Sequence, residues 1–263
     1  MSIQEATHVS ESGHWYDRSG TQVAAVKGVS GDMVKPDLRH ARKFGFVPGV
    51  TTVIKSADRE GLTIYRERSV LMAALTLPRL DGEADEAYCA RVMADSKRSA
   101  AEAAKQGSSL HARVEMGLND PTSDDPWVLA VRNALADMTD MSGGWQVETP
   151  CVHRYGFGTK SDLNNRAANL VVDIKTKEAG LDKVKLYPEH WQQLAATRAA
   201  LGMDDANCAI LFLSRNEPTA TTILASQVDL SHGWDTFKSL LNYWQTKNKC
   251  RPSWADKIYG ETV

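Results

Sequence analysis

The sequence predicts a mixed α/β fold in which helices flank a central mixed β-sheet, with a helical extension on its N-terminal side. Residues 60–105 are rich in Ala, Leu, Glu and Arg, which favour helices. Residues 145–174 instead hold three segments with strand-like alternation, and a helix, two strands and a last helix follow. This order is typical of a sheet covered by helices.

The N-terminal half is expected to be mainly helical after a short extended arm. Gly45 is a typical helix stop, and either Thr51 or Thr52 is a suitable cap for the helix that follows. The long helical region is expected to break near residues 78–82, which begin with Pro and end with Gly. Helices are expected over residues 37–46, 60–105, 100–117 and 126–138.

The C-terminal half is expected to contain the sheet. Polar turns at residues 164–166 and 215–218 separate strand-like segments. Gly202 ends one helix, and Ser231 is a suitable cap for the last one. Strands are expected over residues 145–153, 155–163, 169–174, 206–214 and 219–228, and helices over residues 188–201 and 231–247.

We expect a single domain over residues 1–263. Within it, residues 1–105 form an N-terminal arm and helical region, residues 106–230 the core that carries the candidate site, and residues 231–263 a C-terminal helix and tail. A chain of this length is long enough to bury a substantial core.

Composition excludes several classes of protein. Of the 263 residues, 42% are hydrophobic and 24% charged, which indicates a globular chain rather than a disordered or fibrous one. The longest clear apolar run, residues 209–213, is far shorter than the roughly 20 residues that span a bilayer, so we expect no membrane partner and a cytoplasmic location. The formal net charge is −2, so any nucleic-acid site must be a local basic groove.

Several common site motifs are missing from the sequence. Cys89, Cys151, Cys208 and Cys250 lie far apart, which argues against a structural zinc site and predicts scattered buried thiols. Residues 156–161 lack the spacing of a phosphate-binding loop and lie between predicted strands. The sequence contains no His-Glu-x-x-His zinc motif and no Gly-x-Ser-x-Gly nucleophile motif.

The most informative segment is an apolar strand that ends in Asp-x-Lys. Asp173 and Lys175 lie two residues apart, so they share one face of the strand and Ile174 takes the other. Asp162 ends the preceding predicted strand. Two carboxylates on adjacent strands form an oxygen-rich site that suits Mg²⁺ or Mn²⁺. The lysine ammonium beside them is placed to stabilise charge on a phosphate or to assist deprotonation of a water.

Other polar residues are placed to complete such a site. His111 and Glu115 are four residues apart on one face of a predicted helix. Glu148 lies on the strand before Asp162, and Gln193 lies in the first turns of the helix that follows the Asp-x-Lys strand. Taken singly, Glu148 fits an edge-strand charge equally well, and His111, Glu115 and Gln193 fit surface or capping roles better.

Taken together, these residues resemble the motifs of a known family. Their order is Gly-x-x-x-His, Glu, Asp, Asp-x-Lys-Thr and Gln-Leu, at residues 107–111, 148, 162, 173–176 and 193–194. This order resembles the PD-(D/E)XK nuclease superfamily, and within it the RecB-like and phage exonucleases, a branch similar to the mitochondrial genome maintenance exonuclease. Residues 14–16 with Gly20, and residues 39–43 and 47–53, are also similar to the phage branch, so the likeness extends from about residue 15 to residue 193.

The resemblance implies a restriction-endonuclease-like core and a divalent metal cofactor, Mg²⁺ or Mn²⁺. It implies that His111, Asp162, Asp173 and the backbone carbonyl of Ile174 bind the metal. It does not imply an iron–sulfur cluster, because the cysteines lack the clustered spacing found in some relatives.

The resemblance also implies catalytic roles. Lys175 acts beside the attacked phosphate, and Gln193 contacts DNA or positions the lysine. Glu148 is grouped with the catalytic residues, and Glu115 matches a weaker supporting position. The proline that usually precedes the first motif aspartate is replaced by Ser161, which supplies no ligand.

The activity implied is a metal-dependent DNA exonuclease of phage or bacterial replication or recombination. Its expected partners are DNA with ends, single- or double-stranded, and a single-strand annealing or replication protein. Two alternatives stay open: a structure-selective endonuclease with the same site, and a catalytically inactive DNA-binding or scaffold protein. The residues expected to contact DNA are Lys160, Lys177, Gln193, Trp15 and Arg42.

Overall fold

A computed structural model of the chain describes residues 14–28, 30–57, 60–139, 144–178 and 180–259. Its centre is a five-stranded mixed sheet with the strand order β10-β9-β8-β7-β6. The strands are β6 (Gln146–His153), β7 (Phe157–Asn165), β8 (Leu170–Lys177), β9 (Asn207–Ser214) and β10 (Ala220–Leu224). Within this sheet β8 and β9 pair in parallel, and the other neighbouring strands pair antiparallel. Parallel neighbours need a crossover connection, and α6 (Pro188–Ala200) provides it.

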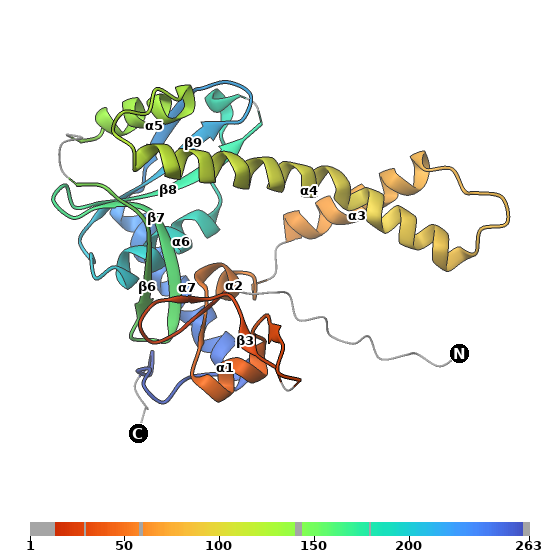
Figure 1. The fold of residues 1–263 in the computed structure, drawn as a ribbon, viewed down its shortest axis with the longest axis horizontal. Helices are drawn as coiled ribbons and strands as arrows, with labels where there is room; N and C mark the ends of the chain where they lie inside the picture. Colours follow the sequence, from red (N-terminus) through yellow and green to blue (C-terminus); the bar gives the residue numbers. More distant parts are fainter. Residues whose placement is uncertain (1–13, 29, 58–59, 140–143, 179, 260–263) are drawn as a thin grey trace.

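Helices cover both faces of this sheet (Figure 1). The helices α4 (Asp85–Leu118) and α5 (Pro126–Ala136) pack on one face, while α6 and α7 (Gln227–Asn248) pack on the other. Strand β9 shows why both faces are covered: Leu211 and Leu213 point into the first core, and Ile210 and Phe212 into the second. All four are fully buried. The predicted mixed α/β fold with flanking helices is confirmed.

A small N-terminal layer packs against one end of the core. The described elements in this layer are β1 (Trp15–Tyr16), β2 (Gln22–Val23), β3 (Val26–Lys27), β4 (Met33–Val34), α1 (Leu38–Phe44), β5 (Val47–Pro48) and α2 (Val50–Ile54). The Asp37 side chain caps α1 by accepting from the backbone N–H groups of Arg39 and His40, and Gly45 ends the helix at a φ of 72°. The predicted stop at Gly45 is confirmed, because a left-handed C-cap favours glycine.

A long helical hairpin projects from the core (Figure 1). It consists of α3 (Glu60–Thr76) and the first half of α4, separated by the predicted break. Several large apolar side chains on α3 stay exposed, among them Ile64, Leu71 and Leu75. The second half of α4 returns along the sheet, and this half brings His111 to the site.

Several boundaries differ from the prediction. The last helix begins at Gln227 rather than at residue 231, because Ser226 accepts the Asp229 N–H at 3.0 Å and caps it. The helix after β5 begins at Val50, so neither Thr51 nor Thr52 is its cap. Helix α4 is continuous over 34 residues rather than two separate segments. Cys89 is exposed on it, whereas Cys208 and Cys250 are buried as predicted.

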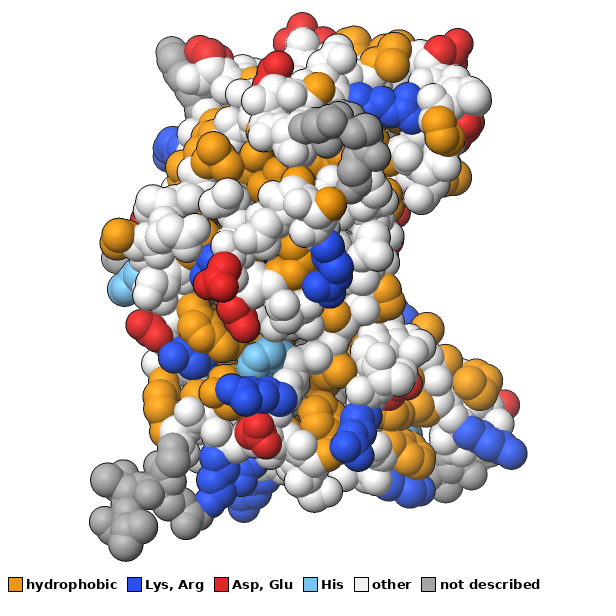
Figure 2. Space-filling view, turned by 90° about the vertical axis from the view of Figure 1, so that its left-hand side faces the viewer, with side chains coloured by type: hydrophobic (Ala, Val, Ile, Leu, Met, Phe, Trp, Pro, Cys, Tyr) orange, Lys and Arg blue, Asp and Glu red, His pale blue; other side chains and the backbone are white. Residues whose placement is uncertain are grey.

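The surface shows no dominant charge on the face shown in Figure 2, which lies opposite the hairpin. Basic side chains gather mainly in the lower half of that view, and acidic ones mark its upper end. Among the described residues, no helix is both long enough and apolar enough to cross a membrane.

Glycine at position 158 is required for the N-terminal layer to pack on β7. A Cβ at Gly158 would overlap the ring of Tyr16, which is itself buried. We therefore expect Gly158→Ala to destabilise the fold by about 1–3 kcal/mol, measured by denaturant unfolding, because overpacking forces the backbone apart. The control is Gly61→Ala in α3, where a Cβ would meet no atom within 4 Å. Equal effects of the two substitutions would contradict this account.

Candidate metal and catalytic site

The candidate site lies where strands β7 and β8 stop pairing. Their register runs from Asn165 opposite Leu170 to Leu163 opposite Val172. At the next position the Asp162 carboxylate, rather than a backbone carbonyl, accepts the N–H of Ile174, at 2.7 Å. The same carboxylate contacts His111 of α4.

Two carboxylates face each other across β6 and β7. In the register of these strands Val147 lies opposite Leu163 and Thr149 opposite Ser161, so Glu148 stands opposite Asp162. Like charges in this position destabilise a sheet. Glu148 also has a φ of 53°, a left-handed conformation that costs a non-glycine residue roughly 1–3 kcal/mol. Strain and repulsion at one point of a sheet are typical of a functional site. The Lys160 ammonium, which pairs with Glu148, offsets part of the repulsion, and a bound cation would offset more of it.

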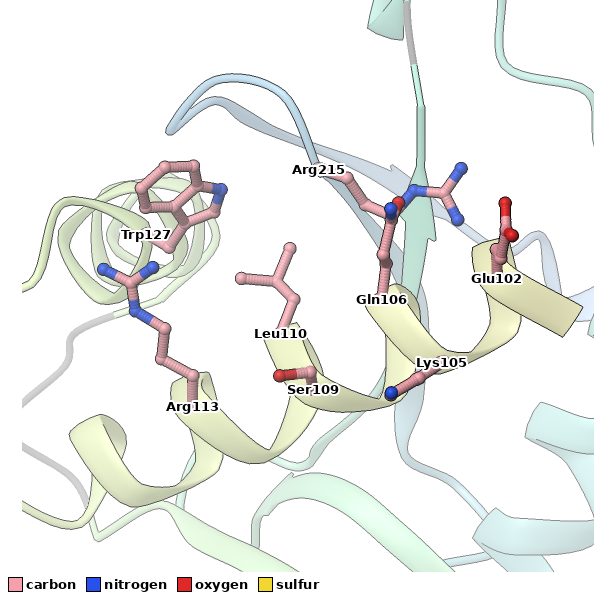
Figure 3. A pocket seen from close by; sticks show the side chains of 8 residues that line it. All are labelled: Glu102, Lys105, Gln106, Ser109, Leu110, Arg113, Trp127 and Arg215. Atoms are coloured by element: carbon pink, nitrogen blue, oxygen red, sulfur yellow. The ribbon is translucent and has the colours of Figure 1, made fainter. Parts of the chain in front are cut away.

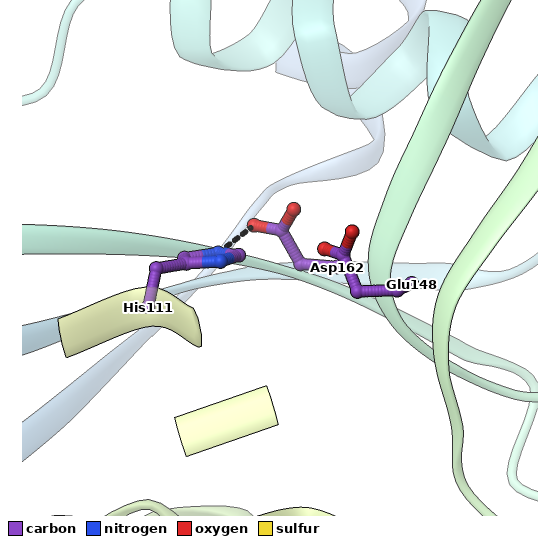
Figure 4. Close-up of side chains that lie close together, drawn as sticks. All are labelled: His111, Glu148 and Asp162. Atoms are coloured by element: carbon purple, nitrogen blue, oxygen red, sulfur yellow. Dashed lines mark ion pairs between the residues drawn. The ribbon is translucent and has the colours of Figure 1, made fainter. Parts of the chain in front are cut away.

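His111 completes a cluster of possible metal ligands (Figure 4). One ligand atom each from His111, Glu148 and Asp162 lies within 4.8 Å of the others. The Nε2 atom of His111 is 3.3 Å from Asp162 Oδ2, and its Nδ1 atom contacts Glu115, which fixes the ring. One imidazole nitrogen and two carboxylate oxygens form a donor set that fits a divalent cation such as Mg²⁺ or Mn²⁺.

Gly107 allows α4 to bring His111 this close. A Cβ at Gly107 would lie 2.7 Å from Oγ1 of Thr176 on β8, closer than real Cβ contacts. The glycine of the sequence motif therefore has a packing role, because it lets α4 lie close to β8. His111 follows one turn further along the same helix.

A second group of side chains lies beside the cluster on the α6 side. Lys175 Nζ is 2.9 Å from Asp173 Oδ2 and donates to Gln193 Oε1 at 3.0 Å. The Gln193 amide in turn donates to Asp173 Oδ1 at 2.8 Å. Each of the three side chains is held by the other two, so the lysine has a defined position next to the carboxylates.

The site perturbs the acidities of its groups. Burial raises the pKa of Asp173 to about 6, against the opposing effect of the Lys175 charge. Burial also acts to lower the pKa of Lys175, but the charges of Asp173 and Asp162 outweigh it and the pKa is raised. Burial likewise acts to lower the pKa of His111, and the hydrogen bond and charge of Asp162, with Glu115, raise it. Mutual perturbation of this kind is common at functional sites.

The structure thus brings most of the predicted site residues together, with one difference in grouping. Glu148, predicted as catalytic, supplies a ligand atom of the three-residue cluster, whereas the Asp173 carboxylate contacts Lys175 and Gln193. The backbone N–H of Ile174 donates to Asp162. Metal binding by His111, Asp162, Asp173 and the Ile174 carbonyl stays a prediction.

Two residues expected to contact DNA have contacts within the protein itself. Trp15 is only 6% exposed, and its ring packs edge-on against Trp244, with the ring centres 6.0 Å apart. Its ring is therefore not accessible to a base. Arg42 donates to the backbone carbonyl of Asn248 at 3.0 and 2.5 Å and ties α1 to the end of α7. Trp15 therefore stabilises the N-terminal layer, and we withdraw it from the DNA-contacting set. Arg42 is exposed, and its contact with DNA stays a prediction.

The two other basic residues of that set lie near the site. The Lys160 ammonium forms an ion pair with Glu148, so it also neutralises part of the acidic cluster. Lys177 follows Lys175 on the same face of β8, and its Nζ lies 5.8 Å from the ring centre of Phe212.

A separate pocket of about 540 Å³ lies on another flank of α4 (Figure 3). Its two arginines already have partners: Arg113 pairs with Asp125 and lies 4.7 Å from the ring centre of Trp127, and Arg215 donates to the Ala103 carbonyl at 2.8 Å. None of the carboxylates of the candidate site lines this pocket, so it plays no part in the chemistry proposed below.

Gln193 is expected to be a positioning residue. For the DNA cleavage proposed below, we predict that Gln193→Leu lowers kcat about tenfold with little change in KM, because Lys175 loses one of its two partners. Metal binding, measured by calorimetry, should stay unchanged. The matched control is Gln106→Leu, on the pocket-lining flank of α4. A change in KM alone would contradict the positioning role.

The chain was compared with known proteins. No protein-family model and no curated protein matches it. The solved structures that are similar to parts of the fold include three crystal structures. SSO0001 is 15% identical, with 43% of this chain and 59% of that chain covered and a TM-score of 0.26. An alkaline exonuclease from Laribacter hongkongensis, LHK-Exo, is 17% identical, with 46% of this chain and 72% of that chain covered and a TM-score of 0.27. LHK-Exo in complex with dAMP is 14% identical, with 69% of this chain and 91% of that chain covered and a TM-score of 0.32. At these TM-scores the function has to be argued from the chain's own site.

Proposed function

We propose that the chain is a divalent-metal-dependent nuclease that hydrolyses phosphodiester bonds of DNA, acting as an exonuclease in phage or bacterial replication or recombination. The observation that carries the proposal is the strained, like-charged pair Glu148 and Asp162, with His111 within 4.8 Å and Lys175 next to it. The choice of DNA, and of an exonuclease over an endonuclease, comes from the family that the sequence motifs resemble.

The residues divide the chemistry between them. His111, Glu148 and Asp162 would hold the metal, with Asp173 as a further candidate ligand. A bound divalent cation lowers the pKa of a coordinated water and offsets negative charge on the phosphate. Lys175, positioned by Gln193, places a cation where charge develops on the phosphate in the transition state. Lys160 and Lys177 add positive charge for the neighbouring DNA backbone.

The proposal is tested by incubating the protein with labelled linear DNA, single- and double-stranded, and with a closed circle, in Mg²⁺, Mn²⁺ or EDTA. We expect metal-dependent loss of linear DNA, an intact circle, and no activity in Asp173→Ala. Cutting of the circle would identify an endonuclease. DNA binding without cleavage in either metal would leave a binding or scaffold protein and overturn the proposal.

A further inference from the structure

Lys175 lies between two hollows of different character. One runs along α4, has a volume of about 640 Å³, and is lined mainly by small side chains such as Ala104, Gly107 and Ser108. The other lies between α2 and α6, has a volume of about 290 Å³, and also contains Gln193. A DNA strand whose phosphate lies at Lys175 therefore has two directions in which its next nucleotide can lie.

The hollow between α2 and α6 combines an aromatic ring with basic side chains. Tyr187 stands at its edge with 46% of its surface exposed. The ring of His190 packs edge-on against Tyr187 at 5.5 Å, which holds the tyrosine in place. Lys55 is exposed on the opposite wall, and Glu189 is the one carboxylate among the lining residues. Nucleic-acid sites that bind single strands combine an aromatic stacking face with cations in this way.

We propose that this hollow binds the nucleotide next to the attacked phosphate, with its base stacked on Tyr187 and its backbone near Lys55. The inference rests on the proposed nuclease function, because Lys175 is taken to mark the position of the phosphate. The hollow along α4 offers the strand a path of small side chains beside Arg215, and its one aromatic ring, that of His111, is already held by Asp162 and Glu115. Tyr187 would therefore set the affinity for the nucleotide without taking part in bond cleavage.

The first test compares KM and kcat of Tyr187→Ala, Tyr187→Phe and wild type on short single-stranded oligonucleotides. We expect KM to rise about fivefold or more in Tyr187→Ala, with kcat nearly unchanged, and to stay normal in Tyr187→Phe, because stacking needs only the ring. The matched control is Tyr243→Ala, an equally exposed tyrosine on α7. An unchanged KM in a folded Tyr187→Ala protein, checked by thermal melting, would overturn the proposal.

The second test needs no cleavage. Oligonucleotides with 2-aminopurine at the 5′ or the 3′ end are titrated with protein in EDTA, and stacking on Tyr187 is expected to quench the fluorescence at one end. The quench should disappear in Tyr187→Ala and persist in Tyr187→Phe and Tyr243→Ala. An equal quench in Tyr187→Ala, or none at either end in wild type, would overturn the subsite. A Tyr187-dependent quench in a protein that cleaves nothing would keep the subsite and reject the nuclease function.

Discussion

Replacement of Asp162 with Asn is expected to abolish metal-dependent cleavage, with kcat lowered roughly 10³-fold or more. Asp162 belongs to the three-residue cluster, contacts His111, and accepts the Ile174 N–H at 2.7 Å. Asparagine keeps an oxygen acceptor for that N–H but loses the charge that a cation requires. The fold should therefore persist while metal binding, measured by calorimetry with Mn²⁺, weakens strongly.

The control for this prediction is Asp235→Asn, which removes a surface carboxylate that pairs with Lys238 on α7. Loss of an exposed pair of this kind changes stability little. If Asp162→Asn bound Mn²⁺ as tightly as wild type, the cluster would not be the metal site. If instead it failed to fold, circular dichroism would show that, and His111→Gln would be the second variant to measure.

Replacement of Lys175 with Ala is expected to lower kcat about 10²- to 10³-fold and to leave Mn²⁺ binding almost intact. Lys175 is not a ligand, and its ammonium is fixed by Asp173 at 2.9 Å and Gln193 at 3.0 Å. Its removal takes away a preorganised positive charge beside the phosphate. The two readouts separate this residue from Asp162, whose loss should affect metal binding and cleavage together.

Lys177→Ala is the matched control for Lys175→Ala, because it removes the next lysine on the same face of β8. It should weaken DNA binding and reduce its salt dependence, with little change in kcat. Similar kcat values for the two variants would show that Lys175 contributes only general electrostatic attraction. Activity of Lys175→Ala equal to wild type would remove the lysine from the proposed chemistry.

The sequence alone predicted the order of the strands and helices around the sheet and most of the residues that the structure brings together at the candidate site. Period-two alternation and apolar runs located the five strands of the sheet, and Gly45 fixed the end of α1, because these signals depend on local geometry. The Asp-x-Lys spacing placed Asp173 and Lys175 on one face of a strand for the same reason. Gln193 entered through the motif order and lies against both of them.

The tertiary structure decided how these residues are grouped. Glu148 and Asp162 become partners only through the pairing of β6 with β7, and the left-handed backbone at Glu148 leaves no mark in the sequence. The separation of β7 from β8 brings His111, from one face, beside groups that face α6. The sequence predicted that Trp15 contacts DNA, but the side chain is buried against Trp244. Tyr187 belongs to none of the sequence motifs, and it became a candidate for nucleotide binding because it lines the same hollow as Lys175. Local patterns depend on residues near in sequence, whereas burial, strain and cross-strand contact depend on residues that folding brings together, and here those contacts define the site.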